Sequence, residues 1–295
     1  MSQAKEDKFS ASFYRTKIGD IRAISLHDGF FTRDRDDKFV TNASLLDVDE
    51  AFSAIGQKQG LLTLTFTALA IETQDGLTLI DTGFGDNGPP TTGQLQKNLK
   101  AAGYLPKDVN TILISHFHGD HINGLVSKSG EIMYPNAKIL VPQPEWDFWM
   151  NDEIMENSPA GLKPNFELCR RIFSVLKNKV SMFNWDDQIS PNVKAICATG
   201  HTPGQTAFEI NSDGDKLIYI ADVTNNPYIF ARHPLWKAAF DVNADDAIAT
   251  RLKILGDASD KNTRLAFYHA PFPGIGYVSR ANESFLFIPQ IWGAD

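Results

Sequence analysis

The 295-residue sequence has only two cysteines, Cys169 and Cys197, and no run of Lys or Arg. One cysteine falls in a helix-like segment and the other in a strand-like segment. We therefore expect two buried small side chains rather than a disulfide or a metal-binding pair. The formal net charge is −8, and nucleic-acid binding requires basic patches, so the sequence excludes nucleic acid as the main partner.

Long apolar runs are also missing, because no stretch is long enough to cross a bilayer. The first eight residues are polar and mixed in charge, without the apolar segment of a secretion signal. We expect a protein without membrane association and with a cytoplasmic location. Residues 1–17 are predicted to form an N-terminal arm, which packs either across the body or against a second subunit. Residues 18–295 are predicted to form a single domain.

Apolar runs typical of strands occur in both halves of the chain and are interspersed with amphipathic segments typical of helices. The turn residues Gln74, Asp75 and Gly76 predict a hairpin. This pattern indicates an α+β domain of two packed sheets with helices on the outside. Strands are expected at residues 21–27, 64–72, 77–80, 111–114, 139–141, 180–183, 193–198, 206–210, 217–221, 265–268, 277–280 and 285–287, and helices at 48–55, 92–102, 144–150, 165–177 and 245–255.

Three imidazoles and one carboxylate lie within six positions directly after the apolar run at residues 111–114: His116, His118, Asp120 and His121. Imidazole nitrogens and carboxylate oxygens are the ligands that Zn²⁺ and similar divalent ions accept. In an extended turn the first two histidines lie on one side, while Asp120 and His121 reach a second point. The spacing therefore predicts two adjacent metal ions. The alternative, ordinary polar loop residues, fits any single histidine better than it fits the whole set.

Further ligands are expected at the ends of other strands, because one turn cannot supply six or more of them. His201, Asp222 and His269 each follow an apolar strand. Asp81 also ends a strand, and is either a turn residue or a carboxylate that orients a ligand histidine through its other ring nitrogen. His27 and His233 are left as structural or surface residues.

The order of these residues, from His116 to His121 and then His201, Asp222 and His269, resembles the metallo-β-lactamase superfamily. The resemblance implies a four-layer αββα sandwich with the metal site at the edge of the two sheets. It also implies that His116, His118 and His201 bind one ion, that Asp120, His121 and His269 bind the other, and that Asp222 bridges both. Two divalent ions per chain, zinc first among them, follow from it.

Three stretches are more closely similar to the branch that contains methyl parathion hydrolase and related lactonases and arylesterases: residues 99–104, 145–149 and 269–276. This similarity implies a dinuclear hydrolase, a homodimer and an aromatic substrate pocket. Phe148, Trp149 and Phe272 are the candidates for that pocket, although core or dimer packing explains the first two nearly as well. Tyr228 is a candidate for an additional hydrogen-bond donor.

The resulting hypothesis is hydrolysis of a small hydrophobic ester or lactone, with organophosphate triesters as further substrates. A hydroxide held between the two ions would attack the carbonyl or phosphoryl group, and the catalytic Asp120 would handle the proton. Two alternatives stay open within the same superfamily, a glyoxalase II-like thioesterase and a single-iron thiol dioxygenase. A binding module with structural metal ions fits less well, because structural zinc sites commonly use cysteine.

Overall fold

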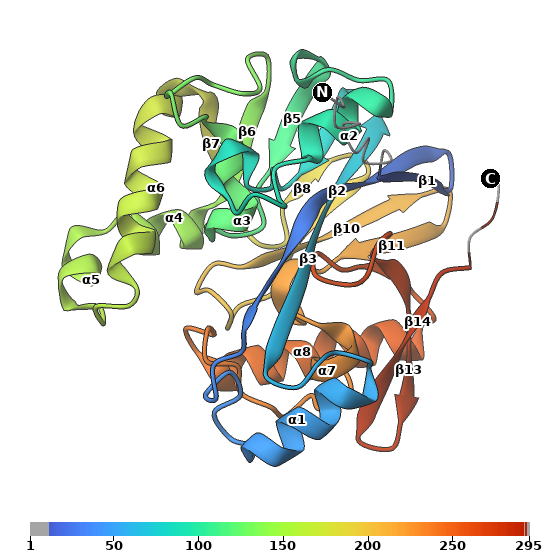
Figure 1. Ribbon diagram of the computed structural model, residues 1–295. Coiled ribbons are helices and arrows are strands. Elements are labelled where there is room, and N and C mark those ends of the chain that lie inside the picture. The colour runs from blue at the N-terminus through green and yellow to red at the C-terminus, as the bar shows by residue number, and fades with distance from the viewer. Residues whose placement is uncertain (1–11, 292, 294–295) are drawn as a thin grey trace, which may run out of the picture.

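Two mixed β-sheets of seven strands each pack against one another in the computed structural model, which describes residues 12–291 and 293 (Figure 1). In the first sheet the strands follow chain order, antiparallel from β1 to β4 and parallel from β4 to β7. Its strands are β1 (Phe13–Ile18), β2 (Ile21–Asp34), β3 (Leu61–Thr73), β4 (Gly76–Ile80), β5 (Val109–Leu113), β6 (Lys138–Pro142) and β7 (Val180–Phe183).

The second sheet has the order β14-β13-β12-β11-β10-β9-β8, and only β11 and β12 run parallel. Buried side chains of both sheets, such as Ile24 of β2 and Phe208 of β10, belong to one hydrophobic core. The strands of this sheet are β8 (Gln188–Ser190), β9 (Val193–Cys197), β10 (Thr206–Ser212), β11 (Asp215–Tyr219), β12 (Arg264–Ala266), β13 (Ile275–Ala281) and β14 (Ser284–Pro289).

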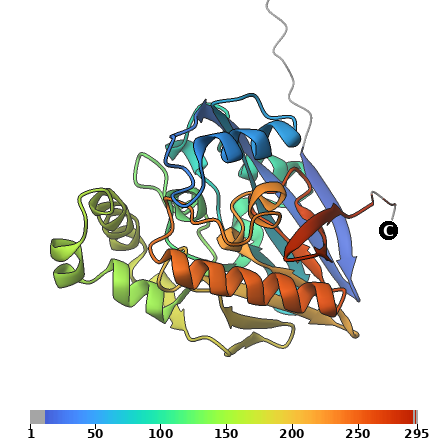
Figure 2. The ribbon, with the colours of Figure 1, turned by 90° about the horizontal axis from the view of Figure 1, so that it is seen from below.

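Helices cover the two sheets and complete the four layers. The long α8 lies against β13 of the second sheet, across the lower face of the molecule, while α4 to α6 project beside β6 and β7 (Figures 1 and 2). The helices are α1 (Leu45–Ala54), α2 (Leu95–Ala101), α3 (Gly119–Ile122), α4 (Gln143–Trp149), α5 (Asp152–Asn157), α6 (Lys163–Leu176), α7 (Pro227–Phe230) and α8 (Ala244–Asp260).

Local sequence explains where the longer helices form. Buried side chains in α6 recur at helical spacing, at Phe166, Cys169, Ile172, Phe173 and Leu176, so one face packs and the other remains in water. The side chain of Ser44 accepts a hydrogen bond from Asp47 N at the start of α1, and Asn243 accepts two at the start of α8. Such caps satisfy backbone donors that have no partner within the helix.

The structure confirms the predicted α+β sandwich and corrects several details. Cys169 is buried as expected, but the expectation for Cys197 was wrong: it is exposed, at the end of β9. β2 continues past His27 to Asp34 through a bulge between His27 and Gly29, which a simple alternating pattern does not reveal. Residues 13–17, assigned to the N-terminal arm, belong to β1, and residues 1–11 of that arm lie outside the described residues.

No helix among the described residues is long and apolar enough to cross a membrane.

The parallel pairing of two pairs of strands positions the site. Because β4 and β5 run parallel, as do β11 and β12, the carboxyl ends of these strands emerge on the same side of their sheets. Four strand ends thereby approach one another at the junction of the sheets.

Candidate metal centre

The seven residues expected to bind metal lie together at this junction. The loop after β5 and the short α3 that follows it supply four of them, and the segments after β9, β11 and β12 supply one each: His116, His118, Asp120, His121, His201, Asp222 and His269. In each of the two groups described next, the potential ligand atoms all lie within 4.8 Å of one another.

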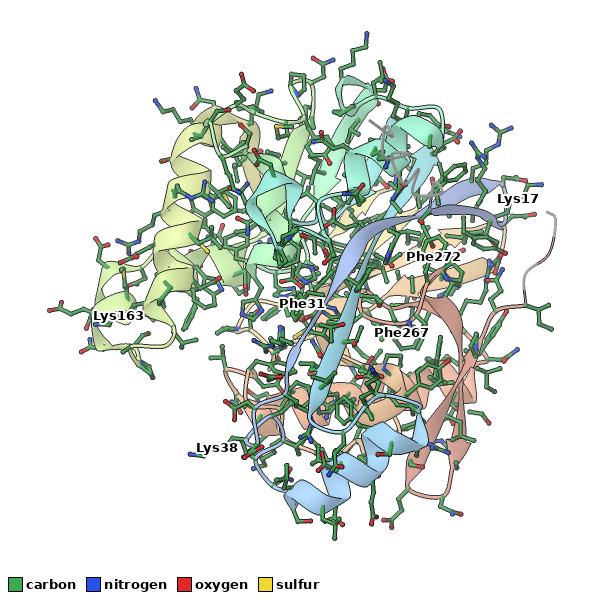
Figure 3. All side chains as sticks on the ribbon, viewed as in Figure 1. Lys17, Phe31, Lys38, Lys163, Phe267 and Phe272 are labelled. Carbon is green, nitrogen blue, oxygen red and sulfur yellow. The ribbon has the colours of Figure 1, made fainter. Side chains whose placement is uncertain are left out.

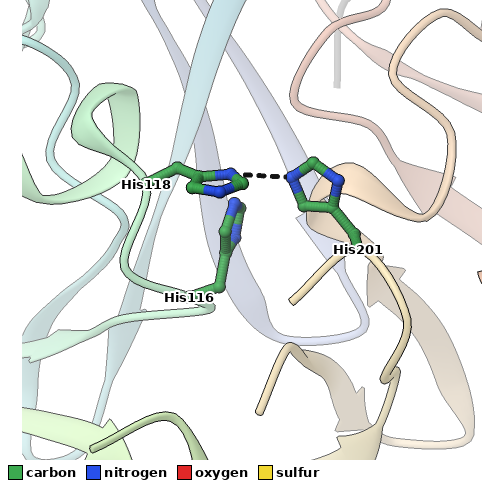
Figure 4. A group of neighbouring side chains, drawn as sticks. All are labelled: His116, His118 and His201. Carbon is green, nitrogen blue, oxygen red and sulfur yellow. Dashed lines mark hydrogen bonds between the residues drawn. The ribbon is translucent and has the colours of Figure 1, made fainter. Parts of the chain in front are cut away.

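The first group consists of His116, His118 and His201. Nδ1 of His118 lies 2.9 Å from Nε2 of His201, and the ring of His116 stands edge-on to both, with centroid separations of 4.9 Å (Figure 4). His116 is fully buried, and its Nε2 has no hydrogen-bond partner. Three imidazole nitrogens therefore converge on one point.

The second group consists of Asp120, His121, Asp222 and His269. Nε2 of His121 lies 3.3 Å from Oδ2 of Asp120 and 3.2 Å from Oδ1 of Asp222. Nε2 of His269 lies 3.0 Å from Oδ2 of Asp222 and 3.5 Å from Oδ2 of Asp120. Two carboxylates and two imidazoles thus face a common centre.

Asp222 also reaches the first group, because its Oδ2 lies 3.4 Å from Nε2 of His201. The side chain is nearly buried, at 3% exposure. Ala221, the residue before it, adopts a left-handed backbone conformation with φ 46°, which is unfavourable for a residue with a Cβ. The turn after β11 therefore holds Asp222 between the two groups at some cost in backbone energy.

The donor set fits a pair of divalent cations. His116 Nε2, His121 Nε2 and Asp222 Oδ1 are all buried and make no hydrogen bond. A buried polar atom without a partner costs about 1–3 kcal/mol, so three of them aimed at one region need an explanation. Cations bound by these nitrogens and oxygens would provide it, because imidazole and carboxylate are ligands that divalent metals accept. The geometry indicates a dinuclear site for divalent metal.

The electrostatics of the two groups differ. Burial lowers the pKa of His116 well below its ordinary value, and burial together with the neighbouring His201 lowers the pKa of His118 to about 3. Both rings are therefore neutral, the form that binds metal. Burial also lowers the pKa of His121, but Asp120, Asp81 and Asp222 outweigh that effect and raise it well above its ordinary value. The second group is thus the one that attracts positive charge more strongly.

Asp81 lies behind His121, where the orienting role would place it. Its Oδ2 accepts hydrogen bonds from Nδ1 of His121 at 2.7 Å, from Oγ of Ser115 at 2.7 Å and from the hydroxyl of Tyr219 at 2.7 Å. Its Oδ1 accepts from Ser115 N at 2.8 Å. Asp81 has φ 62°, so the end of β4, like that of β11, is held in a left-handed conformation next to the site.

The partners of the other histidines could not be found from the sequence. Oδ1 of Asp241 lies 2.9 Å from Nδ1 of His201, and Oγ of Ser115 lies 3.0 Å from Nδ1 of His116. Nδ1 of His269 lies 3.0 Å from the Thr65 carbonyl, which therefore accepts its hydrogen bond. Asp241 follows no apolar strand, and neither a serine hydroxyl nor a backbone carbonyl leaves a distinctive pattern in the sequence.

The structure disperses the four predicted pocket residues. Trp149 is fully buried and lies 6.2 Å from His118 by ring centroids, so it supports a histidine and offers no surface to a substrate. Half-buried Phe148 packs against it, at 4.9 Å. Phe272, which is labelled in Figure 3, belongs to the loop after His269. Its ring centroid lies 5.6 Å from that of His27. Tyr228 packs on Phe287 and lines a groove with α1 that contains none of the seven residues.

Other aromatic rings contact the histidines directly. The half-buried Phe240 lies 5.6 Å from His201, and the buried Phe66 lies 5.3 Å from His269, by ring centroids. Half-buried Phe84 covers Phe66 at 5.0 Å. Phe240 therefore lies against a histidine of the first group and Phe66, with Phe84 packed on it, against a histidine of the second, at positions that carried no signal in the sequence.

The chain belongs to the metallo-β-lactamase superfamily, since the model of that family matches residues 67–269. The match contains all seven residues of the two groups, together with Asp81. The order of the predicted ligand residues and the αββα sandwich both agree with membership of this family.

Among solved structures, a dizinc quorum-quenching lactonase, AidC, in complex with a product, N-hexanoyl-L-homoserine, superposes with a TM-score of 0.90 at 29% identity, covering 96% of this chain and 99% of that one. The hydrolase AbOPH of the β-lactamase superfamily gives a TM-score of 0.90 at 27% identity, covering 97% and 100%. Both neighbours share the complete fold, and both are hydrolases.

Curated relatives match over part of their length. An N-acyl homoserine lactonase from a Bacillus species is 26% identical over 172 residues, which cover 52% of this chain and 61% of the relative. A probable metallo-hydrolase from Mycobacterium tuberculosis is 32% identical over 190 residues, covering 55% of this chain and 57% of the relative. The matched part of the chain thus spans about three fifths of these relatives. Each of these relatives, like the two structural neighbours, is named as a lactonase or a hydrolase.

Proposed function

We propose that this protein is a dinuclear metal-dependent lactonase that opens small hydrophobic lactones, N-acyl homoserine lactones first among them. The observation that carries the proposal is the position of Asp222 between two complete ligand groups. The lactonase names of AidC and of the Bacillus relative support the choice of lactone. Zinc is the proposed metal, because the donor set is made of imidazole and carboxylate and AidC is described as a dizinc enzyme.

Divalent cations, when bound, would supply Lewis acidity for the lactone carbonyl and for the activation of water near neutral pH. His116, His118 and His201 would hold one cation, and Asp120, His121 and His269 the other. Asp222 would contact both, because its Oδ2 lies 3.4 Å from Nε2 of His201 in the first group and 3.0 Å from Nε2 of His269 in the second. These assignments follow the two clusters that the side chains form.

Asp120 is the proposed catalytic residue. Its side chain is 17% exposed, more than the other acid of the centre, so it is the carboxylate that a substrate can approach. Water adds across the acyl carbon–oxygen bond of the ring: its oxygen joins the acyl carbon, and one proton passes by way of Asp120 to the departing alkoxide. The products are the carboxylate and hydroxyl of the opened ring, and one proton is released.

Phe84 and Phe240 favour a neutral, apolar acyl group near the histidines. Aryl esters and organophosphate triesters, which are also neutral and apolar, are proposed as further substrates of the same site. A single-iron thiol dioxygenase would need one ligand group, whereas this chain has two. A thioesterase shares the two-metal chemistry and is separated from a lactonase by assay.

The test is a substrate panel on zinc-loaded protein. It comprises acyl homoserine lactones of increasing chain length, aryl esters, an organophosphate triester and a glutathione thioester. Hydrolysis is monitored through the proton that it releases, and we expect it to be fastest with the lactones. Asp120→Asn should reduce the rate of lactone hydrolysis by about 10²–10⁴-fold. Preferred turnover of the thioester would contradict the lactone assignment. Equal rates for the native protein and the Asp120→Asn variant would remove the proposed catalytic role.

The homodimer implied by the resemblance is part of the proposal. Exposed apolar side chains on α1 and the edge strand β14, including Leu46 at 66% and Ile288 at 48%, supply surface for such an interface. Light scattering coupled to gel filtration tests it, because a monomeric mass at micromolar concentration would contradict it.

A further inference from the structure

A buried carboxylate outside the two ligand groups connects the loops that carry the three histidines. Glu145 lies on α4 with no exposed surface, and its carboxylate accepts four hydrogen bonds. The donors are the backbone N–H of Phe117 at 2.9 Å, Nε1 of Trp149 at 2.7 Å, the hydroxyl of Thr202 at 2.8 Å and the backbone N–H of Gly204 at 2.7 Å. Neither the motif nor the metal assignment uses this residue.

The two carboxylate oxygens of Glu145 accept hydrogen bonds from different segments. Oε1 holds Phe117, which lies between His116 and His118, and Oε2 holds Thr202 and Gly204, directly after His201. One side chain thus fixes the separation of the two segments that meet in the first group (Figure 4). We propose that Glu145 is a positioning residue that sets the geometry of the three-histidine half of the metal centre, an inference that rests on the proposed dinuclear function.

The packing around Glu145 supports this role. A Cβ on Gly204 would lie 2.1 Å from the backbone N of Glu145, so the loop after His201 approaches α4 as closely as a glycine permits. One turn further along α4, Trp149 donates to Oε1 and places its ring next to His118. Burial raises the pKa of Glu145, while the bonds from Phe117 and Thr202 oppose that effect. A buried acid with four donors costs desolvation energy that a general packing residue would not incur.

The second group has a separate support. Asp81 holds His121 and Ser115, whereas none of the four hydrogen bonds to Glu145 comes from Asp120, His121, Asp222 or His269. Removal of Glu145 should therefore weaken the binding of the ion in the three-histidine group and leave the binding of the other ion unchanged. Removal of a merely structural residue would weaken the binding of both ions or of neither.

The experiment uses two backgrounds that each leave one ligand group complete. His269→Ala leaves the three-histidine group, and His118→Ala leaves the second group. The affinity of the remaining Zn²⁺ is measured by competition with a chromophoric chelator, with and without Glu145→Ala. In the His269→Ala background we expect the Zn²⁺ affinity to fall by about 10–100-fold, the range seen when a partner that orients a ligand is removed. In the His118→Ala background we expect the affinity to fall by less than about twofold, because Glu145 does not contact the second group.

Two further variants make the result decisive. Asp147→Ala removes an exposed acid from the same helix and should change neither affinity. Glu145→Gln keeps one accepting oxygen and should give an intermediate loss in the His269→Ala background, and it replaces Glu145→Ala if that chain does not fold. Equal losses in both backgrounds, or no loss in either, would overturn the proposal. A native chain that binds no Zn²⁺ would instead show that the metal centre itself is wrong.

Discussion

Oδ1 of Asp241 lies 2.9 Å from Nδ1 of His201, and the same ring turns its Nε2 toward Asp222 and His118. The carboxylate fixes which nitrogen of His201 carries the proton and leaves Nε2 free to bind metal. Both side chains are buried, so water cannot replace the interaction.

Asp241→Ala should therefore weaken metal binding about 10–100-fold, because His201 loses the partner that orients its ring. Asp241→Asn retains an oxygen that can accept from Nδ1, and we expect a smaller loss. Chelator competition on the two variants checks the order. Native affinity in Asp241→Ala would show that the ring is held by packing alone, for example against Phe240.

Arg251 of α8 should be among the residues most important for stability. Its buried guanidinium donates to the carbonyls of Val223, Pro234 and Trp236, and its NH2 lies 3.8 Å from Oδ2 of Asp241. Arg251→Met leaves three buried carbonyls without this donor and removes the cation beside Oδ2 of Asp241, which should lower the free energy of unfolding by about 3–5 kcal/mol.

Denaturant unfolding followed by tryptophan fluorescence measures that loss. Arg280→Met is the matched control, because Arg280 pairs with Asp260 on the exposed surface and should leave the unfolding midpoint unchanged. Similar midpoints for the two variants would contradict the importance assigned to the buried contacts of Arg251.

Stability should depend on pH through Asp28, which is fully buried and holds the loop before α2 through hydrogen bonds from Phe84, Gly93 and Leu95. Burial raises the pKa of Asp28 to about 6, and these three donors only partly oppose that rise. Between about pH 4 and pH 6 the folded chain therefore keeps a proton that the unfolded chain releases. The contribution of Asp28 to folding declines as the pH rises through this window.

Asp28→Asn removes this titration. The unfolding free energy of the native chain, minus that of the variant, should fall by up to about 3 kcal/mol between pH 4 and pH 6. Urea titrations of the metal-free protein at several pH values give this difference, and Asp147→Asn serves as the exposed control. A difference that rises with pH would show that Asp28 ionises more easily in the folded chain.

Gly204 should tolerate no side chain, because a Cβ there would lie 2.1 Å from the backbone N of Glu145. Gly204→Ala should separate the His201 loop from α4 and lower the unfolding free energy by about 1–3 kcal/mol. Thermal unfolding checks this result. Gly161→Ala, where a Cβ meets open space and φ is likewise not left-handed, is the matched control and should leave the unfolding temperature nearly unchanged.

The sequence is most informative where a residue's role follows from its place on a strand. Asp222 and His269 each follow an apolar run, and the parallel pair β11 and β12 brings these two ends together, whereas His201 follows β9, which pairs only with antiparallel strands. Periodicity likewise predicted α6, whose buried residues recur along one face. These features depend on short-range order, which a single chain displays directly.

The remaining features depend on contacts between distant segments. Asp241 is separated from His201 by 40 positions, and Glu145 reaches Phe117 and Gly204 from a helix of its own. Cys197 was expected to be buried because it ends a strand, yet its side chain faces outward there. Tyr228 follows Asp222 closely in the chain, but α7 turns it toward Phe287. Only the packed fold determines these directions.

The most direct test of the account is the metal content of the purified protein after loading with Zn²⁺ and removal of excess metal. Elemental analysis should give about two zinc ions per native chain and about one in His118→Ala and in His269→Ala, since each variant loses one ligand group. A content of one ion in the native chain and none in either variant would contradict the central claim. It would mean that the seven residues form a single site.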